Sequence, residues 1–276
     1  MSRHFTSVVS SWFGKFASKE FPPAIQKFIN GAYVKIMGLD MGEFKSPAEY
    51  KSLNKLFTRE LMTPRELPED GVISPSDSLV TQQAKIENKT ALQIKGMEYS
   101  VAEFLGEFYS DEVEKLEAGE YINLYLSPKD YHRYHAPFDL RVDSIVHVPA
   151  KLYPVNIPFL KKKKNLFIEN ERVVISAKDS HNKRHFIVLV GALNVGKMVV
   201  TFEDKIKTNA HSEKITHYSY ETPISLKRGE LFGWFEMGST IVMLSEKGAI
   251  KYSVAVDEKV KFAQKIGVLL KEEELK

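Results

Sequence analysis

Cysteine is absent from the 276 residues, which excludes disulfides, thiolate nucleophiles, thiolate zinc sites and thiolate-bound iron–sulfur clusters. The chain also lacks an uninterrupted apolar run long enough for a membrane-spanning helix. Neither charge sign dominates, because 39 Lys and Arg stand against 36 Asp and Glu; the net charge of +3 does not predict a nucleic-acid-binding protein. The N-terminus has no positive, apolar and small-residue blocks of a secretory signal, so we expect an intracellular protein.

The composition that remains is that of a globular protein, with 43% hydrophobic and 27% charged residues. The first sixty residues predict helices, because apolar side chains recur at helical spacing over residues 8–16 and 25–36. We weigh two interpretations of these stripes. They pack against the main domain, or the first helix, with Trp12, Phe13 and Phe16, lies in a membrane interface.

A third helix is predicted over residues 46–61. Ser46 and Glu49 have the spacing of a capping box, and Pro47 stands at the first helical position. Tyr50 and the leucine and phenylalanine residues after it are expected to form the buried side of this helix.

From about residue 63 the sequence changes to short runs rich in Val, Ile, Tyr and Phe, punctuated by prolines. Such runs predict strands of a sandwich or barrel, with one helix near residues 101–108. We therefore predict an α+β protein with a helical, membrane-associating region over residues 1–62 and a β-rich, sandwich- or barrel-like domain over residues 63–276. The clearest strands are expected at residues 121–126, 172–176, 186–190, 197–202 and 240–244, the third and fourth being joined at a glycine turn.

The most concentrated charge in the chain is the run Lys161–Lys164, which has apolar pairs on either side. One interpretation is a solvated hairpin or loop. The other is a loop that inserts its apolar neighbours into a bilayer and places the lysines on lipid phosphates.

Two histidines in the segment 127–137 are candidates for chemistry. The segment opens with a Ser-Pro-x-Asp pattern that predicts a short helical turn, which would place His132 and His135 on one face. No third ligand accompanies the pair in the sequence, so we favour an acid–base or structural role, and no metal is predicted.

An aspartate and a serine join these histidines as candidates. Asp77 ends a second Ser-Pro-x-Asp turn, and Ser239 belongs to a Gly-Ser-Thr triplet that precedes an apolar strand. Each pattern alone is typical of a turn, but serine, histidine and aspartate together are the groups of an activated hydroxyl. No Gly-x-Ser-x-Gly elbow surrounds Ser239, which argues against an ordinary α/β-hydrolase.

The order of these patterns along the chain, together with several others, is informative. They lie at Phe57–Leu61, Ser74–Asp77, Leu126–Pro137, Asn170–Val174, Val190–Gly196, Lys227–Gly233 and Met237–Thr240. In this order and spacing the motifs resemble the shorter, prokaryotic type of the phosphatidylserine decarboxylase family.

The resemblance implies a proenzyme that makes its own cofactor, a pyruvoyl group, from Ser239. Asp77 would orient and stabilise His135, and His135 would take the proton of the Ser239 hydroxyl. The serine oxygen would then attack the carbonyl of Gly238, and elimination and hydrolysis would leave the pyruvoyl group.

The resemblance also implies the reaction and its setting. The pyruvoyl ketone would form a Schiff base with the amine of phosphatidylserine and accept electrons as carbon dioxide leaves, giving phosphatidylethanolamine. His132 is expected to handle protons in this second stage. A heterodimer of chains 1–238 (beta) and 239–276 (alpha), itself paired as a homodimer, is expected on the cytoplasmic side of the cell membrane. It would be a peripheral protein on an anionic surface, without a nucleic-acid partner.

Two positions depart from the family pattern. Ser78 stands where a glycine usually follows the turn aspartate, which could alter the backbone of the turn. Met237 stands where a leucine usually precedes the glycine, and this change conserves volume.

Three alternatives stay open at this point. The first is a serine hydrolase that uses Ser239, His135 and Asp77 without self-cleavage. The second is a pyruvoyl enzyme that acts on a free amino acid. The third is a β-rich membrane-binding scaffold without activity.

Overall fold

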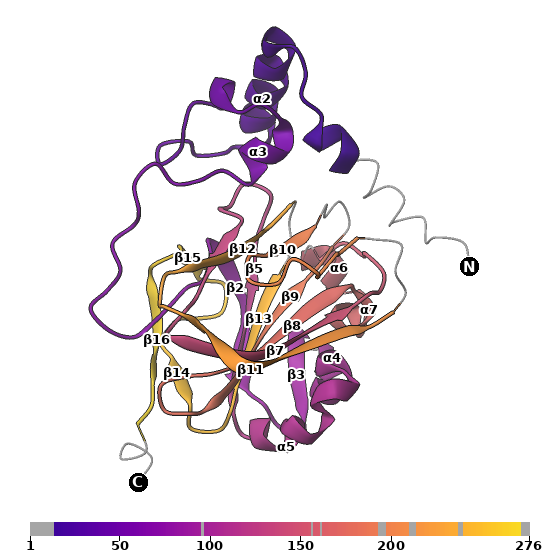
Figure 1. Ribbon diagram of the computed structural model, residues 1–276, viewed down its shortest axis with the longest axis vertical. Helices are drawn as coiled ribbons and strands as arrows, with labels where there is room; N and C mark the ends of the chain where they lie inside the picture. The colour runs from indigo at the N-terminus through magenta and orange to yellow at the C-terminus, as the bar shows by residue number, and fades with distance from the viewer. Residues whose placement is uncertain are drawn as a thin grey trace.

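The computed structural model describes residues 14–94, 97–155, 157–160, 162–192, 197–209, 214–236 and 240–271. A small group of helices lies at one end of the molecule, above a body made mostly of strands (Figure 1). The mixed α+β class and the dominance of strands are therefore as predicted. Five short helices pack on the body: α4 (Val101–Leu105), η2 (Glu107–Glu112), α5 (Val113–Leu116), α6 (Ile157–Leu160) and α7 (Leu166–Glu169).

The body is built on an eight-stranded sheet in which every neighbouring pair of strands is antiparallel. All five strand segments singled out above form strands. The barrel part of the prediction is wrong, because the described residues form open sheets and this one ends at two edges. In spatial order its strands are β11 (Thr216–Leu226), β7 (Leu140–Val148), β8 (Arg172–Lys178), β9 (Arg184–Val190), β13 (Thr240–Ser245), β5 (Glu120–Tyr125), β2 (Ser78–Lys85) and β15 (Lys259–Val260).

Three smaller sheets complete the body. The predicted strands on either side of Gly191 are real, but they belong to different sheets and do not form a hairpin. The smaller sheets are β10 (Met198–Val200), β12 (Leu231–Phe235) and β6 (Arg133–His135); β1 (Val72–Ile73), β16 (Lys265–Leu269) and β14 (Ile250–Tyr252); and the hairpin of β3 (Thr90–Ile94) with β4 (Met97–Ser100).

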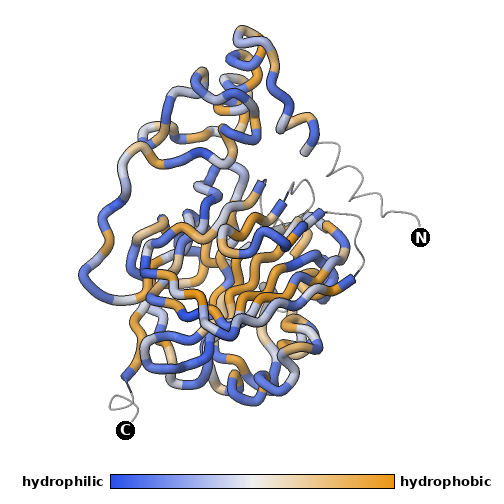
Figure 2. The backbone as a smooth tube through the Cα atoms, viewed as in Figure 1, coloured by the Kyte–Doolittle hydropathy of each residue, from blue (hydrophilic) through white to orange (hydrophobic). Residues whose placement is uncertain are grey.

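The central strands of the eight-stranded sheet are buried on both faces, and β13 shows this most clearly. Ile241 and Met243 point into one hydrophobic core, which the two three-stranded sheets cover, whereas Val242 and Leu244 point into a second core under α4 and α7. Burial on both faces explains why the strand is a continuous apolar run, without alternating polar residues. Figure 2 shows the hydrophobic segments concentrated in these central strands.

The helix at the far end, α2 (Pro23–Met37), contains the predicted apolar segment 25–36. Proline occupies its first turn, and Gly38 adopts the left-handed conformation (φ 65°) that closes the last turn. The side chains that α2 buries are not the apolar ones that the packing interpretation requires. The polar residues Gln26 and Asn30 are buried, whereas Phe28 and Ile36 are 76% and 80% exposed.

The third predicted helix is wrong as a single element. The capping box forms, but it starts only the 3-10 turn η1 (Pro47–Glu49), and α3 (Leu53–Phe57) begins separately with Ser52 as its N-cap. The buried side chain of Asn30 donates to the carbonyls of Pro47 and Tyr50, at 2.8 and 2.9 Å. These bonds hold the chain in an extended conformation at Tyr50 and interrupt the helix.

The lysine run joins α6 and α7, so it is not a β-hairpin; Lys161 itself lies outside the described residues. Leu160, Leu166 and Phe167, on either side of the run, are fully buried in the core. The interpretation in which these apolar neighbours enter a bilayer is therefore wrong. Within the described parts of the chain, no helix has the length and apolar character needed to span a membrane.

Candidate active site

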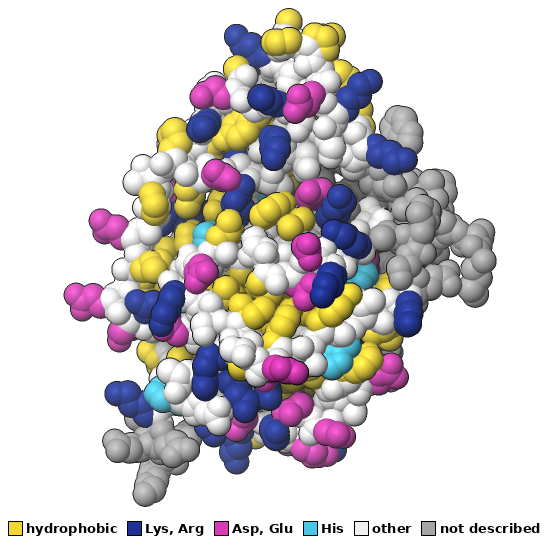
Figure 3. Space-filling model, in the orientation of Figure 1, with side chains coloured by type: hydrophobic (Ala, Val, Ile, Leu, Met, Phe, Trp, Pro, Cys, Tyr) yellow, Lys and Arg dark blue, Asp and Glu magenta, His cyan; other side chains and the backbone are white. Residues whose placement is uncertain are grey.

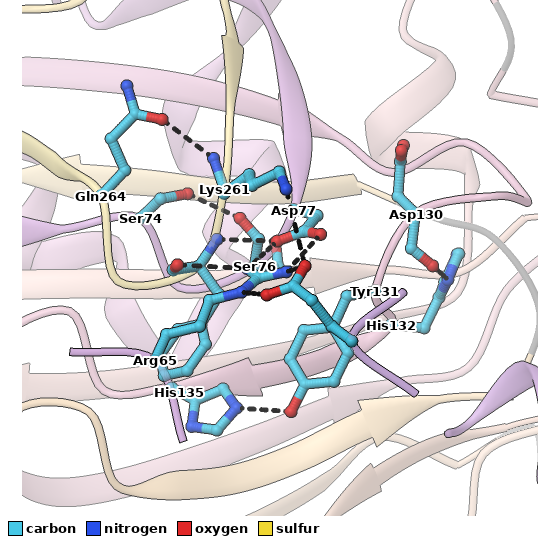
Figure 4. Close-up of polar contacts among 12 residues, drawn as sticks. Arg65, Ser74, Ser76, Asp77, Asp130, Tyr131, His132, His135, Lys261 and Gln264 are labelled. Atoms are coloured by element: carbon cyan, nitrogen blue, oxygen red, sulfur yellow. Dashed lines mark hydrogen bonds and ion pairs between the residues drawn. The ribbon is translucent and has the colours of Figure 1, made fainter. Parts of the chain in front are cut away.

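The two candidate histidines lie on an extended segment, which corrects the predicted helical turn. Ser127 and Asp130 do form a turn, in which the Asp130 carboxylate accepts from the Ser127 backbone N–H and hydroxyl, both at 2.7 Å. Strand β6 then begins at Arg133. Because side chains alternate along extended backbone, His132 and His135 point to opposite sides. They occupy two environments (Figure 4).

His135 is held as a neutral imidazole with a defined tautomer. Its Nδ1 is 2.8 Å from the carbonyl oxygen of Gly229, so Nδ1 carries the proton and donates it. Its Nε2 is 3.0 Å from the hydroxyl of Tyr131; burial raises the pKa of that phenol, so the hydroxyl donates to Nε2. Burial lowers the pKa of His135 to about 4, which leaves a free base at neutral pH.

Asp77 lies on the neighbouring turn, and its carboxylate binds Arg65 and not His135. Arg65 reaches both carboxylate oxygens, at 2.5 and 3.1 Å (Figure 4). The backbone N–H of Phe262 donates to the same carboxylate at 2.8 Å, and the Phe262 ring stacks on His135 with centroids 3.7 Å apart. The connection between Asp77 and His135 therefore runs through Phe262.

The turn itself is joined to the histidine strand, since the His135 backbone N–H donates to the Pro75 carbonyl at 2.9 Å. Ser78 is the first residue of β2 and is not among the residues with positive φ. Serine is therefore accommodated at this position without backbone strain.

His132 is fully buried, and its two ring nitrogens differ in their hydrogen bonding. Nδ1 lies 2.8 Å from the Asp130 carbonyl oxygen, and Nε2 has no hydrogen-bond partner among the described residues. The ring packs on Phe57 with centroids 4.0 Å apart. Burial, with the nearby Arg59 charge acting in the same direction, lowers the pKa of His132 to about 3. An unbonded, neutral Nε2 in a dry site is available to accept a proton or a hydrogen bond.

The segment with Gly238 and Ser239 lies outside the described residues, but both of its neighbours are placed. On the N-terminal side, the Phe235 backbone N–H donates to the His132 carbonyl at 2.9 Å. On the C-terminal side, Thr240 starts β13 between Tyr125 of β5 and Val190 of β9. The Thr240 hydroxyl is buried and has no hydrogen-bond partner in the described parts of the chain. The fold thus brings both ends of the serine segment to the end of the sheet near His132.

Strand β12, which leads to this segment, needs a glycine at its centre. A Cβ on Gly233 would lie 2.0 Å from the Val199 carbonyl oxygen and 2.3 Å from the Tyr134 ring. The Tyr134 hydroxyl crosses over this position to donate to Val199 at 2.6 Å. The close packing of β10, β12 and β6 fixes the strand that carries His135.

A second serine–histidine–aspartate arrangement exists at the other end of β13. His185 lies 2.9 Å from the Ser245 hydroxyl and 3.1 Å from the Asp179 carboxylate. All three residues are at most 2% exposed, so the arrangement is closed to substrates. We therefore assign His185 a structural role.

Sequence reasoning gave no role to four residues that the structure places around the candidates: Arg59, Arg65, Tyr131 and Phe262. Tyr131 and Arg59 lie inside two of the motifs named above, so the sequence contains a signal that could have identified them. Arg65 and Phe262 have no local signal, because their contacts with Asp77 depend on segments far apart in the chain.

Comparison with known proteins gives one consistent result. The family described as phosphatidylserine decarboxylase matches residues 53–268. A protein named phosphatidylserine decarboxylase proenzyme from Helicobacter pylori (strain Shi470) is 46% identical over 265 residues, covering 95% of this chain and 97% of that protein. Proteins of the same name from Campylobacter jejuni and Brevibacillus brevis are 45% and 33% identical, over 95% and 91% of this chain and 98% and 89% of their own lengths.

Proposed function

Because the chain belongs to the phosphatidylserine decarboxylase family, we propose that it is a self-processing proenzyme whose Ser239 becomes a pyruvoyl group and which decarboxylates phosphatidylserine. The observation that carries the proposal is family membership over nearly the whole chain. A neutral, oriented His135 beside the turn of Asp77 supports the assignment of the site.

His135 is the base for self-cleavage. Its Nε2 accepts a hydrogen bond from the Tyr131 hydroxyl. A serine hydroxyl that gives its proton to Nε2 requires the same geometry. The Ser239 oxygen gives up its proton, bonds to the Gly238 carbonyl carbon, and the peptide C–N bond breaks with protonation of the nitrogen. The product is an ester with a free amine.

The ester then undergoes elimination. Loss of the α-proton of residue 239 expels the Gly238 carboxylate and leaves dehydroalanine, and addition of water with release of ammonia leaves the pyruvoyl group. Asp77 acts as a positioning residue, because its bond to the Phe262 backbone holds the ring that stacks on His135.

The residues around position 239 suit a polar, planar group. The buried Thr240 hydroxyl and His132 Nε2 both lack partners within the described segments and can hydrogen-bond to it. A pyruvoyl group supplies a ketone that condenses with an amine and withdraws electrons from the bond to the departing carboxylate. His132 keeps its proton on Nδ1 and uses Nε2 to hold or deliver a proton at the reacting carbon.

The helical end of the molecule is the proposed contact with the membrane. Ile25, Phe28 and Ile36 of α2 are at least half exposed, and Phe16 is partly exposed beside them in sequence. Figure 3 shows apolar side chains, with lysine and arginine among them, at the end formed by the helices. An exposed apolar helix face next to basic residues suits a peripheral protein on an anionic bilayer. The domain boundary near residue 62 and the homodimer stay predictions.

The test is the intact mass of freshly purified protein under denaturing conditions. We expect two chains, 1–238 and 239–276. The second should be lighter by one ammonia than a peptide that begins with an ordinary serine. Ser239→Ala should remain a single chain of 31.5 kDa. Carbon dioxide release from phosphatidylserine in detergent micelles checks the second stage. A folded wild-type protein that stays intact would contradict the proposal, and fluorophosphonate labelling of Ser239 would then favour a hydrolase.

A further inference from the structure

Arg59 is a buried guanidinium that is only partly used. The residue is 2% exposed, and Nη2 donates to the backbone carbonyls of Lys129 and Asp130, at 2.7 and 3.2 Å. Nε and Nη1 are buried and have no hydrogen-bond partner in the described structure. Burial lowers the pKa of the guanidinium. A desolvated cation with unused donors is strongly stabilised by a nearby anion.

A cavity of about 320 Å³ lies beside this guanidinium. Besides Arg59, its lining includes Lys45, Lys55, Arg133 and Glu60. Glu60 accepts from Arg133 at 2.6 Å, which compensates one of the four cations. Neither Lys45 nor Lys55 forms an ion pair with the described residues. The cavity therefore has an excess of positive charge on its lining.

The cavity adjoins the proposed catalytic histidine. Arg59 and His132 both donate to the carbonyl oxygen of Asp130, at 3.2 and 2.8 Å. Phe57, two residues before Arg59, packs its ring on His132. The shared Asp130 carbonyl and the Phe57 ring connect Arg59 to His132. A ligand beside Arg59 therefore lies close to His132.

From this juxtaposition we infer that the cavity binds the phosphate of the lipid head group. Arg59 provides the guanidinium charge in the cavity wall, and Lys45 and Lys55 provide further point charges on the lining. The inference rests on the proposed function and adds the site that positions the substrate.

The phosphate is a better ligand for this site than the carboxylate of the same substrate. Cations on the carboxylate would stabilise the negative charge that disperses as carbon dioxide leaves, and would raise the barrier. Cations on the phosphate, which does not react, bind the ground state and the transition state alike and still orient the molecule.

The test uses the full-length Ser239→Ala protein, so that binding is measured without turnover. Calorimetry compares monomeric dihexanoyl phosphatidylserine, dihexanoyl phosphatidylethanolamine and inorganic phosphate. We expect the two lipids to bind with similar affinity, because they share the phosphodiester, and phosphate to bind more weakly. The double variant Lys45→Gln/Lys55→Gln should weaken both lipids about ten-fold. The matched control Lys51→Gln, an exposed lysine outside the cavity, should leave both affinities unchanged.

A second arm uses the self-cleaved protein with Ser239 restored. The double lysine variant should cleave normally by intact mass, raise KM for phosphatidylserine about ten-fold and leave kcat nearly unchanged. Arg59→Lys should raise KM further, because the compact ammonium of lysine does not reproduce the planar guanidinium with its several donors. A wild-type protein that fails to cleave or to release carbon dioxide would overturn the proposed function, whereas a failure confined to the variants overturns only this inference.

Three results would overturn the phosphate assignment. In the first, dihexanoyl phosphatidylethanolamine fails to bind while the serine lipid binds, which would place the carboxylate in the cavity. In the second, inorganic phosphate binds as tightly as the lipids and loses its affinity in Arg59→Lys, which would make this a site for free phosphate. In the third, both lysine substitutions leave KM and lipid affinity unchanged.

Discussion

Arg65 binds both carboxylate oxygens of Asp77, at 2.5 and 3.1 Å, and this ion pair faces the backbone of Phe262. The Phe262 carbonyl accepts from Arg65 at 3.2 Å, and the ring of the same residue stacks on His135. Arg65, Asp77 and Phe262 therefore form one unit that supports the imidazole from a single side.

The first prediction concerns this unit. Arg65→Gln should slow self-cleavage about 10- to 100-fold, and Asp77→Asn at least as much, because each releases Phe262 from its position against His135. Arg65→Lys should recover part of the rate, since it restores the charge without the two-point geometry. The measurement is the fraction of intact chain against time after synthesis. Lys89→Gln, which breaks an exposed ion pair with Glu114 on the β3–β4 side, is the control and should cleave at the wild-type rate.

The second prediction concerns pH. Burial lowers the pKa of His132 to about 3 and of His135 to about 4, below the ordinary value of 6.5. The unfolded chain therefore binds more protons, so the stability from these residues is present above pH 6.5 and is lost as pH falls toward about 4. Between pH 6.5 and 5 the free energy of unfolding should drop by about 3 kcal/mol for the two residues together.

Urea unfolding of the Ser239→Ala protein at several pH values measures this pH dependence of the free energy of unfolding. His135→Asn should remove about half of it, whereas His181→Asn, an exposed histidine, should leave it unchanged. The same shift predicts a self-cleavage rate that is flat between pH 6 and 8. A rate that follows a group titrating near 6.5 would argue against His135 as the base.

The third prediction concerns the buried polar contacts of α2. Asn30→Ala removes the side chain that binds the Pro47 and Tyr50 carbonyls and the Gln26 amide, so it should lower the free energy of unfolding by about 2–3 kcal/mol. Chemical denaturation checks the value. Lys27→Ala, on the exposed side of the same helix, should change stability by less than about 0.5 kcal/mol. Equal stability of the two variants would mean that these bonds do not hold the helical end together.

The fourth prediction concerns the apolar face of α2. Phe28→Ser and Ile36→Ser should each reduce binding to phosphatidylserine-containing vesicles about ten-fold or more, since each removes an apolar side chain worth about 1.5–3 kcal/mol on burial. Unfolding should be nearly unaffected, because both side chains are already exposed. Val256→Ser, an exposed apolar residue of the strand-rich body, is the control for vesicle sedimentation. Undiminished binding of both α2 variants would place the membrane contact elsewhere.

Local signals were sufficient for much of the fold. The apolar runs at 186–190 and 240–244 became central strands, because burial on both faces leaves no other place for them. The helical spacing over residues 25–36 was a reliable signal for α2, because the repeat acts between neighbouring turns. The prediction of the third helix was wrong because of Asn30, which lies sixteen residues before Ser46. Its side chain donates to backbone carbonyls that would otherwise accept the hydrogen bonds of the helix.

The candidate site shows the same limit. Its residue types could be recognised in sequence, but not their contacts. Asp77 is bound to Arg65 and Phe262, which are twelve and 185 residues away, and no local pattern encodes either contact. The buried set of His185, Ser245 and Asp179 has the same residue types as the candidates, so the types alone do not identify a site.

The position of β13 has a consequence for how the molecule folds. This strand lies between β9 and β5 at the centre of the eight-stranded sheet, directly after the proposed cut. Cleavage would leave β13 to β16 on the shorter chain, while their partners β9, β5, β2 and β1 stay on the longer one. Folding is a first-order process before the cut and a second-order one after it. The proenzyme thus assembles at a rate independent of concentration, whereas the denatured mature enzyme must recover its central strand by collision between two chains.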